Sequence, residues 1–262
     1  MRLAFQVAYI GTDFHGSQMQ ASSRTVEGTF IRDCQDLGLF DDWRKAGFAF
    51  SGRTDRGVHA RRQICAFTTS LPERAIGRLN RILPEDCWCT GWAETDETFH
   101  PRYHAKTRTY RYYLYDDGTT DLACMQEAAS LLLGTHNFTH FSRLKGKNPE
   151  KTILSSQIHI ENGFYVYEIT APGFLWNMVR CIVTALVAIG RNEIDTDYLT
   201  ALLNATPRMR HLTPAPAEGL ILWDIDCGIT FTPLAVSGRR KDAVRERRRY
   251  FETMKKVDML LD

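Results

Sequence analysis

The stretch Ile153-Leu-Ser-Ser-Gln-Ile-His-Ile-Glu-Asn-Gly-Phe-Tyr-Val-Tyr-Glu-Ile-Thr-Ala171 carries the clearest local fold signal in this 262-residue chain. Its centre, Asn162-Gly163, strongly favours a two-residue turn between antiparallel strands. Residues 153–160 and 164–171 flank that turn and contain many β-branched and aromatic side chains, which favour strands. The sequence therefore predicts a β-hairpin here.

The hairpin lies inside a larger β-α-β-β-α-β unit. The other elements that the sequence predicts for this half are a strand over 108–115, a helix over 122–133, a helix over 174–189, a short helix over 198–204 and a strand over 219–226. Gly134 and Gly190 follow the two longer helices, and glycine is the residue that most often ends a helix.

The first part of the chain repeats this order of elements. It predicts a strand over 2–9, a helix over 26–37, strands over 46–51 and 61–69, a helix over 72–83 and a strand over 87–93. Each half is therefore a ferredoxin-like, split β-α-β unit. We expect an α+β protein whose two ferredoxin-like halves form a central, mostly antiparallel sheet with a cleft between them. The halves are expected at residues 1–100 and 101–236, followed by a basic helical extension at 237–262.

The overall composition is that of an ordinary globular protein, with 44% hydrophobic and 24% charged residues. The most apolar stretch, 174–189, is interrupted by Asn177 and Arg180, so it indicates a buried helix rather than a membrane span. The first residues lack the continuous apolar core of a signal peptide. We therefore expect a cytoplasmic protein that does not enter a membrane.

The cysteines and histidines do not predict a disulfide framework or a metal site. The cysteines number seven, and the nearest pair, Cys87 and Cys89, is one residue too close for a CxxC motif. Reduced cysteines in a core fit this pattern better. His136 and His140 are four residues apart, but no third ligand is evident, so we expect no metal.

The net charge of +2 hides an uneven distribution of basic residues. Arginines crowd the segment 53–62, residues 102–111 contain four basic residues and no acid, and residues 239–256 contain nine basic residues. Such local stripes on a near-neutral protein fit a polyanion that lies across one face. For the 239–256 segment, an ordinary solvated helix fits equally well.

The loop Gly52-Arg-Thr-Asp-Arg-Gly57 places a single acid among arginines between two predicted strands. Taken alone, it fits a structural turn in which Asp55 accepts backbone hydrogen bonds. Two other segments favour a functional reading. Tyr110-Arg-Tyr-Tyr-Leu-Tyr115 interleaves aromatic and basic residues, as proteins do when they stack unpaired bases. Arg180 lies in an otherwise apolar segment and needs an anionic partner, for which Asp55 is a candidate.

Three motifs together resemble the tRNA pseudouridine synthase A family. They are Gly52-Arg-Thr-Asp-Arg-Gly-Val-His59, Tyr110-Arg111-Tyr112 and Met178-Val179-Arg180, and they occur in the order that the family has. The resemblance implies a pseudouridine synthase-type fold, with Asp55 as the catalytic carboxylate. It also implies that Tyr110 packs on the target base and that Arg180 pairs with Asp55.

The family's reaction isomerises uridine to pseudouridine without a redox cofactor or metal, so the resemblance implies no cofactor. It implies uridines in the anticodon stem-loop of tRNA, around positions 38 to 40, and a homodimer that holds the tRNA. Arg53 and Arg56 flank the acid and are candidate substrate-binding residues that grip phosphates or replace the displaced base.

The chain departs from the bacterial pattern at two positions. Ser17 stands where those proteins usually have Trp, and Arg56 stands where they tend to have Ala. We expect both to affect how the RNA is gripped. Two alternatives remain: a non-catalytic RNA-binding protein of the same fold, and a hydrolase that acts on the N-glycosidic bond of a nucleoside.

Overall fold

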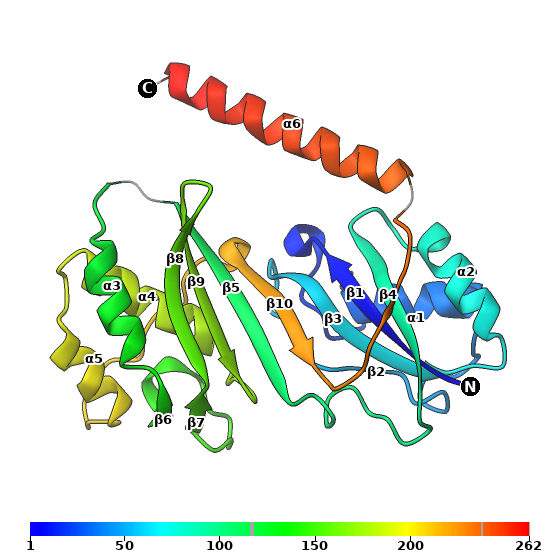
Figure 1. Ribbon diagram of the computed structural model, residues 1–262, viewed down its shortest axis with the longest axis horizontal. Coiled ribbons are helices and arrows are strands. Elements are labelled where there is room, and N and C mark those ends of the chain that lie inside the picture. Colours follow the sequence, from blue (N-terminus) through cyan, green and yellow to red (C-terminus); the bar gives the residue numbers. More distant parts are fainter. Residues whose placement is uncertain (116–117, 237, 262) are drawn as a thin grey trace.

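The computed structural model describes residues 1–115, 118–236 and 238–261. Its main feature is a nine-stranded sheet with the strand order β11-β4-β1-β3-β10-β5-β9-β8, and β2 also pairs with β3. Figure 1 shows this sheet running across the molecule, with the long helix α6 beyond one end of the strands.

The first half contains the six elements that the sequence predicts. They are β1 (Arg2–Tyr9), α1 (Val26–Asp36), β2 (Ala49–Phe50), β3 (His59–Thr68), α2 (Pro72–Ile82) and β4 (Cys87–Thr95), with the short 3-10 helix η1 (Gly11–Asp13) after β1. The side chain of Thr25 caps α1 by accepting a hydrogen bond from the backbone N–H of Gly28. Pro72 begins α2, where its fixed backbone angle favours a helix.

The second half repeats the order with additions. It consists of β5 (Thr107–Tyr115), α3 (Leu122–Ser130), β6 (Gly134–Asn137), η2 (Thr139–Phe141), β7 (Glu150–Ile153), β8 (Ser155–Glu161), β9 (Phe164–Ala171), α4 (Met178–Gly190), α5 (Thr196–Leu203), η3 (Ala217–Gly219) and β10 (Leu220–Asp226). Asn162 and Gly163 have φ values of 52° and 80°, so the two-residue turn that the sequence predicts is confirmed. The chain continues through β11 (Thr232–Pro233) to α6 (Gly238–Leu261).

The strand order confirms the two ferredoxin-like halves. In the first half, β4, β1, β3 and β2 are neighbours in that order, and β10, β5, β9 and β8 repeat the arrangement in the second half. All pairs within a half are antiparallel. The halves join where β10 pairs in parallel with the start of β3, at Ile221–His59 and Leu222–Ala60. One continuous sheet therefore supports both halves.

The strand predicted over 46–51 is much shorter than expected. Only Ala49 and Phe50 form β2, because Gly47 has a φ of 61° and ends a turn that occupies the preceding residues. The short strand has a topological consequence. β2 pairs near the end of β3, which leaves the start of the same β3 edge available to β10.

The helix predicted over 174–189 begins four residues later than expected. Asn177 adopts a left-handed φ of 62° immediately before Met178, and residues 174–175 are irregular. The strand pair β6–β7 and the short β11 were not predicted, because their segments carry little alternation of apolar and polar residues. The helix predicted over 122–133 ends at Ser130.

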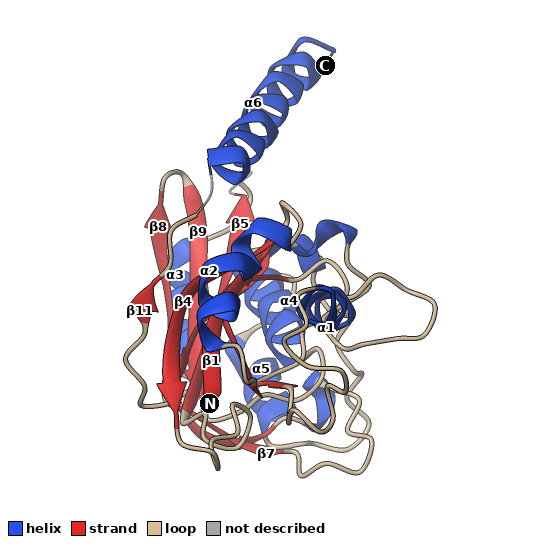
Figure 2. Ribbon diagram, turned by 90° about the vertical axis from the view of Figure 1, so that its right-hand side faces the viewer, coloured by secondary structure: helices blue, strands red, loops and turns tan. Residues whose placement is uncertain are grey.

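The helices α1 to α5 pack on one face of the sheet, which leaves the opposite face without any of them (Figure 2). Two hydrophobic cores fill the covered side, one in each half. The first is rich in phenylalanine, and the second surrounds α4, whose residues are mostly buried. None of the helices within the described residues combines the length and apolar character that a bilayer crossing requires.

Candidate active site

Buried hydrogen bonds hold the loop from Ser51 to Val58 in place. The backbone N–H of Thr54 donates to Ser17 Oγ at 2.8 Å, and Thr54 Oγ1 lies 2.7 Å from the Tyr9 hydroxyl. Gly57 has a φ of 84°, and a Cβ at this position would lie 3.1 Å from the Cβ of Ala217. These contacts fix the loop between the two halves and direct Asp55 toward the second half.

Asp55 contacts two side chains from the segment that precedes and opens α4. Trp176 Nε1 donates a hydrogen bond to Asp55 Oδ1 at 2.8 Å, and Arg180 Nη1 lies 3.7 Å from Asp55 Oδ2. Burial raises the pKa of Asp55 above its usual value, while the Trp176 hydrogen bond and the charge of Arg180 act in the opposite direction. Both partners therefore stabilise the ionised carboxylate, which burial disfavours.

Arg180 is fixed by the backbone around it. Its Nε donates to the carbonyl of Ala215 at 2.5 Å, and its Nη1 lies 3.4 Å from Asn177 Oδ1. The Arg180 carbonyl in turn accepts from the backbone N–H of Ala215 at 3.1 Å. The predicted meeting of Arg180 with Asp55 is therefore present in the structure, as a charge contact longer than a good hydrogen bond.

Tyr110 lies on β5 and faces the same cavity. Its ring meets Phe174 edge-to-face at a centroid distance of 5.2 Å. Burial raises the pKa of Tyr110 to about 12. Asp55, Tyr110 and Arg180 line one cavity of about 60 Å³, together with Trp176 and other neighbours. The structure thus brings together the three residues that the sequence singles out, from three separate segments.

A wider cleft of about 710 Å³ opens above this cavity and is lined by both halves. Its basic lining residues are Arg53, Arg56, Arg102, Arg108, Arg143, Lys145 and Lys147, and its acid is Asp55. Arg53 and Arg56 are exposed on the cleft wall. A cleft with this charge attracts a polyanion and favours binding of its phosphates.

The basic residues of the segment 102–111 do not form one continuous surface. Arg111 lies next to Tyr110 on β5, so it points to the opposite face of the sheet, where it pairs with Glu168 at 2.6 Å. Arg108 donates to the carbonyls of Ser51 at 3.0 Å and Pro172 at 2.6 Å, which ties the loop to the second half. The expectation that these basic residues form one stripe for a polyanion is therefore wrong for Arg111. The Arg108 guanidinium donates mainly to backbone carbonyls.

Two features of the site were missed by sequence reasoning. Trp176 lies in the apolar segment 174–189, and a helix over that segment gave no reason to place its indole N–H on a carboxylate. Lys145 lies over the Trp176 ring at 4.4 Å, and it belongs to a loop between η2 and β7. The sequence signal that could have indicated Lys145 is the run Arg143-Leu-Lys-Gly-Lys147, which contains basic residues and a glycine.

The rings of His136 and His140 each contact a backbone carbonyl. The His136 ring is 2.8 Å from the Leu133 carbonyl, and the buried His140 ring is 3.2 Å from the Thr206 carbonyl. Each ring therefore has a local backbone partner. The seven cysteines are all free thiols, and all but Cys124 are buried.

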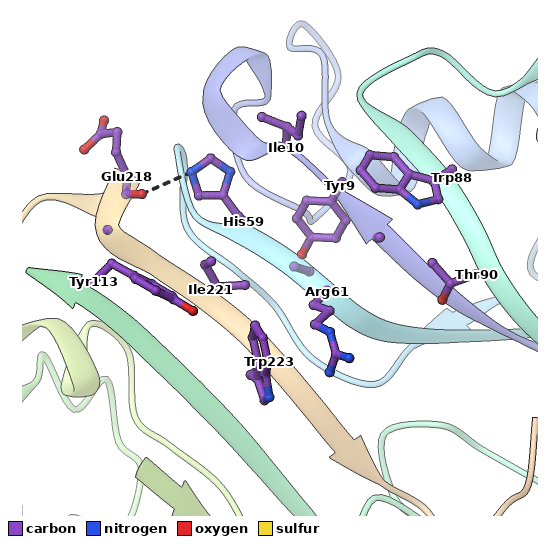
Figure 3. A pocket seen from close by; sticks show the side chains of 13 residues that line it. Tyr9, Ile10, His59, Arg61, Trp88, Thr90, Tyr113, Glu218, Ile221 and Trp223 are labelled. Atoms are coloured by element: carbon purple, nitrogen blue, oxygen red, sulfur yellow. Dashed lines mark hydrogen bonds between the residues drawn. The ribbon is translucent and has the colours of Figure 1, made fainter. Parts of the chain in front are cut away.

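A second hollow, of about 530 Å³, lies on the face of the sheet away from α1 to α5 (Figure 3). It holds aromatic side chains, including Trp88, Tyr113 and Trp223, and none of the predicted site residues. His59, at the end of the loop, reaches this face and meets the Glu218 carbonyl at 3.1 Å. Asp55 in the loop and His59 at the start of β3 thus line hollows on opposite faces of the sheet.

Comparison with known proteins indicates the same family as the three sequence motifs. A family model described as tRNA pseudouridine synthase matches residues 128–226. The tRNA pseudouridine synthase A of Methanoculleus marisnigri is 53% identical over 98% of this chain and 94% of its own length. The chain belongs to the tRNA pseudouridine synthase A family. Its resemblance to that family, first seen in three motifs, is confirmed.

Other members of the family align over nearly the whole chain. The tRNA pseudouridine synthase A of Methanosphaerula palustris is 47% identical over 100% of this chain and 93% of its own length. That of Thermococcus onnurineus is 39% identical over 96% of this chain and 93% of its own length. The predicted enzyme class, an isomerase that makes pseudouridine in tRNA, is therefore confirmed over both alternatives.

Proposed function

We propose that Asp55 is the catalytic carboxylate of a tRNA uridine isomerase, with Tyr110 and Arg180 completing its site. The observation that carries the proposal is the shared cavity: Asp55 comes from the first half, Tyr110 and Arg180 come from the second, and all three line it. That cavity lies at the floor of a basic cleft. A carboxylate there meets the sugar–base junction of a nucleotide whose phosphates the cleft holds.

The reaction breaks the bond between ribose and the uracil nitrogen, turns the base, and joins it to ribose through carbon. An ionised carboxylate supports it by attacking the sugar or by stabilising positive charge there, as carboxylates do in glycoside hydrolysis. Arg180 and Trp176 favour the ionised form of Asp55, against the effect of burial. Uracil C5 loses a proton to solvent and the freed N1 takes one up, so substrate and product are isomers.

The proposed role of Tyr110 is to stack on the detached base. Its pKa of about 12 leaves the hydroxyl protonated at neutral pH, so it is a poor general base. An aromatic face beside the cavity instead holds the planar base while its bond to ribose is broken.

The target uridine is proposed to lie in the anticodon stem-loop, around positions 38 to 40. A paired base must first leave its stack, which costs a few kcal/mol. Arg53 and Arg56, exposed on the cleft wall, are proposed to grip the phosphates or fill the space that the base leaves. A homodimer in the cytoplasm belongs to the same proposal.

The test is release of tritium from tRNA labelled at uridine C5. The protein should release label from tRNA that carries uridine at positions 38 to 40, with pseudouridine found at those positions. Release should fall to background when the three positions are replaced by cytidine. Free uracil as the product would show hydrolysis instead, and label released equally from the replaced tRNA would refute the proposed positions.

A further inference from the structure

The helix α6 extends from the body of the protein and is rich in basic residues (Figure 1). At a rise of about 1.5 Å per residue, its 24 residues span about 36 Å. It carries nine lysines and arginines against four acids. Among its residues only Arg240 is buried. A hydrophobic face packed on the body therefore does not explain why this helix is present.

The root of α6 is nevertheless firmly held. The Arg240 guanidinium donates to the carbonyls of Leu83, Pro84 and Cys87 at 3.2, 2.8 and 3.0 Å, just beyond the C-terminal end of α2. Arg247 Nη2 donates to Thr12 Oγ1 at 2.9 Å. The direction of the helix is thereby fixed, while the residues beyond 247 project outward.

Arg247, where the projecting part begins, contacts a segment that leads into the cleft. Thr12 is three residues before His15, which lines the cleft wall beside Gly16. In Figure 2, α6 rises from the end of the sheet and leans toward the side that carries the other helices, which is the side of Asp55. A polymer that fills the cleft and continues past His15 therefore meets α6.

The chemistry of the projecting part matches RNA. Arg248, Arg249, Lys255 and Lys256 are exposed, and no ion pair joins any of the four to another described residue. The adjacent rings of Tyr250 and Phe251 are also exposed, with 60% and 55% of their surface accessible. Arginines beside aromatic rings grip phosphates and pack on riboses and bases.

We infer that α6 is an RNA-binding arm that holds the sugar–phosphate backbone of tRNA outside the catalytic cleft. The inference rests on tRNA being the substrate, and it adds a second contact region to the proposed site. A second copy of the chain fits less well, because two such helices repel each other through their net positive charge. The arm contributes affinity and leaves the chemical step unchanged.

The experiment compares two full-length variants that each lose four positive charges. The arm variant combines Arg248→Gln, Arg249→Gln, Lys255→Gln and Lys256→Gln, since glutamine preserves helix propensity. The control combines Arg78→Gln, Arg81→Gln, Arg208→Gln and Arg210→Gln, four exposed residues that do not line the cleft. Dissociation constants for tRNA are measured across a salt series, alongside single-turnover tritium release with protein in excess.

The arm variant should bind tRNA about tenfold more weakly near physiological salt, and its affinity should depend less steeply on salt, by about 0.9 in the log–log slope for each lost phosphate contact. Its single-turnover rate at saturating protein should equal that of the wild type. The control should change neither quantity beyond a small effect of net charge.

Equal losses of affinity in the two variants would overturn the inference, because position on α6 would then not matter. Unchanged tRNA binding with altered self-association in sedimentation would overturn it too, by assigning α6 to a second copy. Absence of tritium release from the wild type would instead count against the proposed function, so the two failures are distinguishable.

Discussion

At the scale of single residues, the site depends on a carboxylate whose environment opposes its charge. Burial raises the pKa of Asp55, and Trp176 and Arg180 act against that effect. The cavity of about 60 Å³ is also smaller than the space of about 150 Å³ that holds a benzene ring in a protein core. Trp176, which is 38% exposed, lines both this cavity and the wide cleft, so its indole lies where uracil would enter.

Replacement of Trp176 by Phe should shift the pH dependence of the reaction. The indole N–H stabilises the ionised form of Asp55, so its loss raises the pKa of Asp55 further. With Asp55 as the proposed catalytic carboxylate, activity falls as pH decreases through that pKa. The acidic limb of the single-turnover rate should therefore move to higher pH, while Trp223→Phe, on the opposite sheet face, leaves it in place. An acidic limb that does not move, or that moves to lower pH, contradicts this role.

Replacement of Arg180 by Ala should abolish turnover while tRNA affinity largely survives. The guanidinium contacts Asp55 and the local backbone and does not line the wide basic cleft. Tritium release and a binding titration on the same preparation separate the two effects. Retained turnover would refute the pairing of Arg180 with Asp55.

Ser17 has a different role from the one that its sequence context suggests. It departs from the bacterial pattern, and we expected an effect on RNA contacts. The structure instead shows it buried, with its hydroxyl accepting from the N–H of Thr54 next to Asp55.

Ser17→Ala should lower the free energy of unfolding by about 1–3 kcal/mol, because a buried N–H then lacks a partner. Urea denaturation measures the change. The exposed Ser22→Ala serves as the control, with an expected change below about 0.5 kcal/mol. An unfolding free energy of Ser17→Ala equal to that of the wild type would show that Thr54 does not depend on this hydroxyl.

At the scale of elements, α6 is attached mainly through Arg240, whose guanidinium binds carbonyls at the end of α2. Arg240→Ala should therefore detach the helix while leaving the sheet folded. Limited proteolysis should cleave the variant near residue 240 well before the wild type, and the remaining fragment should stay intact. Matched cleavage rates for wild type and variant would show that other contacts hold α6. Arg245→Ala, an exposed change in the same helix, is the control.

The elements differ in how far local sequence determines them. The hairpin around Asn162 was predictable because its turn requires positive φ at both central residues, which Asn-Gly supplies. The helix α1 was predictable from its apolar spacing. The start of α4 was not, because residues 174–176 are apolar enough for a helix, and no local pattern indicated that Asn177 adopts a left-handed conformation.

The same limit applies to the site. The sequence placed Asp55, Tyr110 and Arg180 in motifs, yet the hydrogen bond from Trp176 depends on tertiary geometry and has no local signature. The opposite directions of Tyr110 and Arg111 follow from strand alternation, which the sequence did contain. Basic residues counted along a strand therefore overestimate the charge of one face.

At the scale of the whole molecule, His59 links the two halves through one ring. Its Nδ1 accepts from the N–H of Gly11 at 3.0 Å. Its Nε2 meets the Glu218 carbonyl at 3.1 Å (Figure 3). An accepting Nδ1 requires the neutral ring, with its proton on Nε2. Burial lowers the pKa of His59 below its usual value of 6.5.

This arrangement predicts a pH-dependent contribution to stability. Because the pKa of His59 is lower in the folded protein, the unfolded chain binds more protons, and stability increases with pH in this range. The contribution is complete above about pH 6.5 and is lost as pH falls toward the folded pKa. The unfolding free energy of the wild type relative to His59→Gln should therefore be larger at pH 7.5 than at pH 5.5. A difference that is independent of pH would show that His59 does not titrate on unfolding.

The continuous sheet brings side chains of both halves to one cavity, where we propose that Asp55 performs the chemistry. The most direct test is single-turnover tritium release from C5-labelled tRNA by Asp55→Asn, at a protein concentration that saturates binding. The variant keeps the shape of the side chain and removes its charge. We expect release at background level with tRNA affinity within about twofold of the wild type, since the cleft arginines remain. Release at a rate close to that of the wild type would contradict the claim.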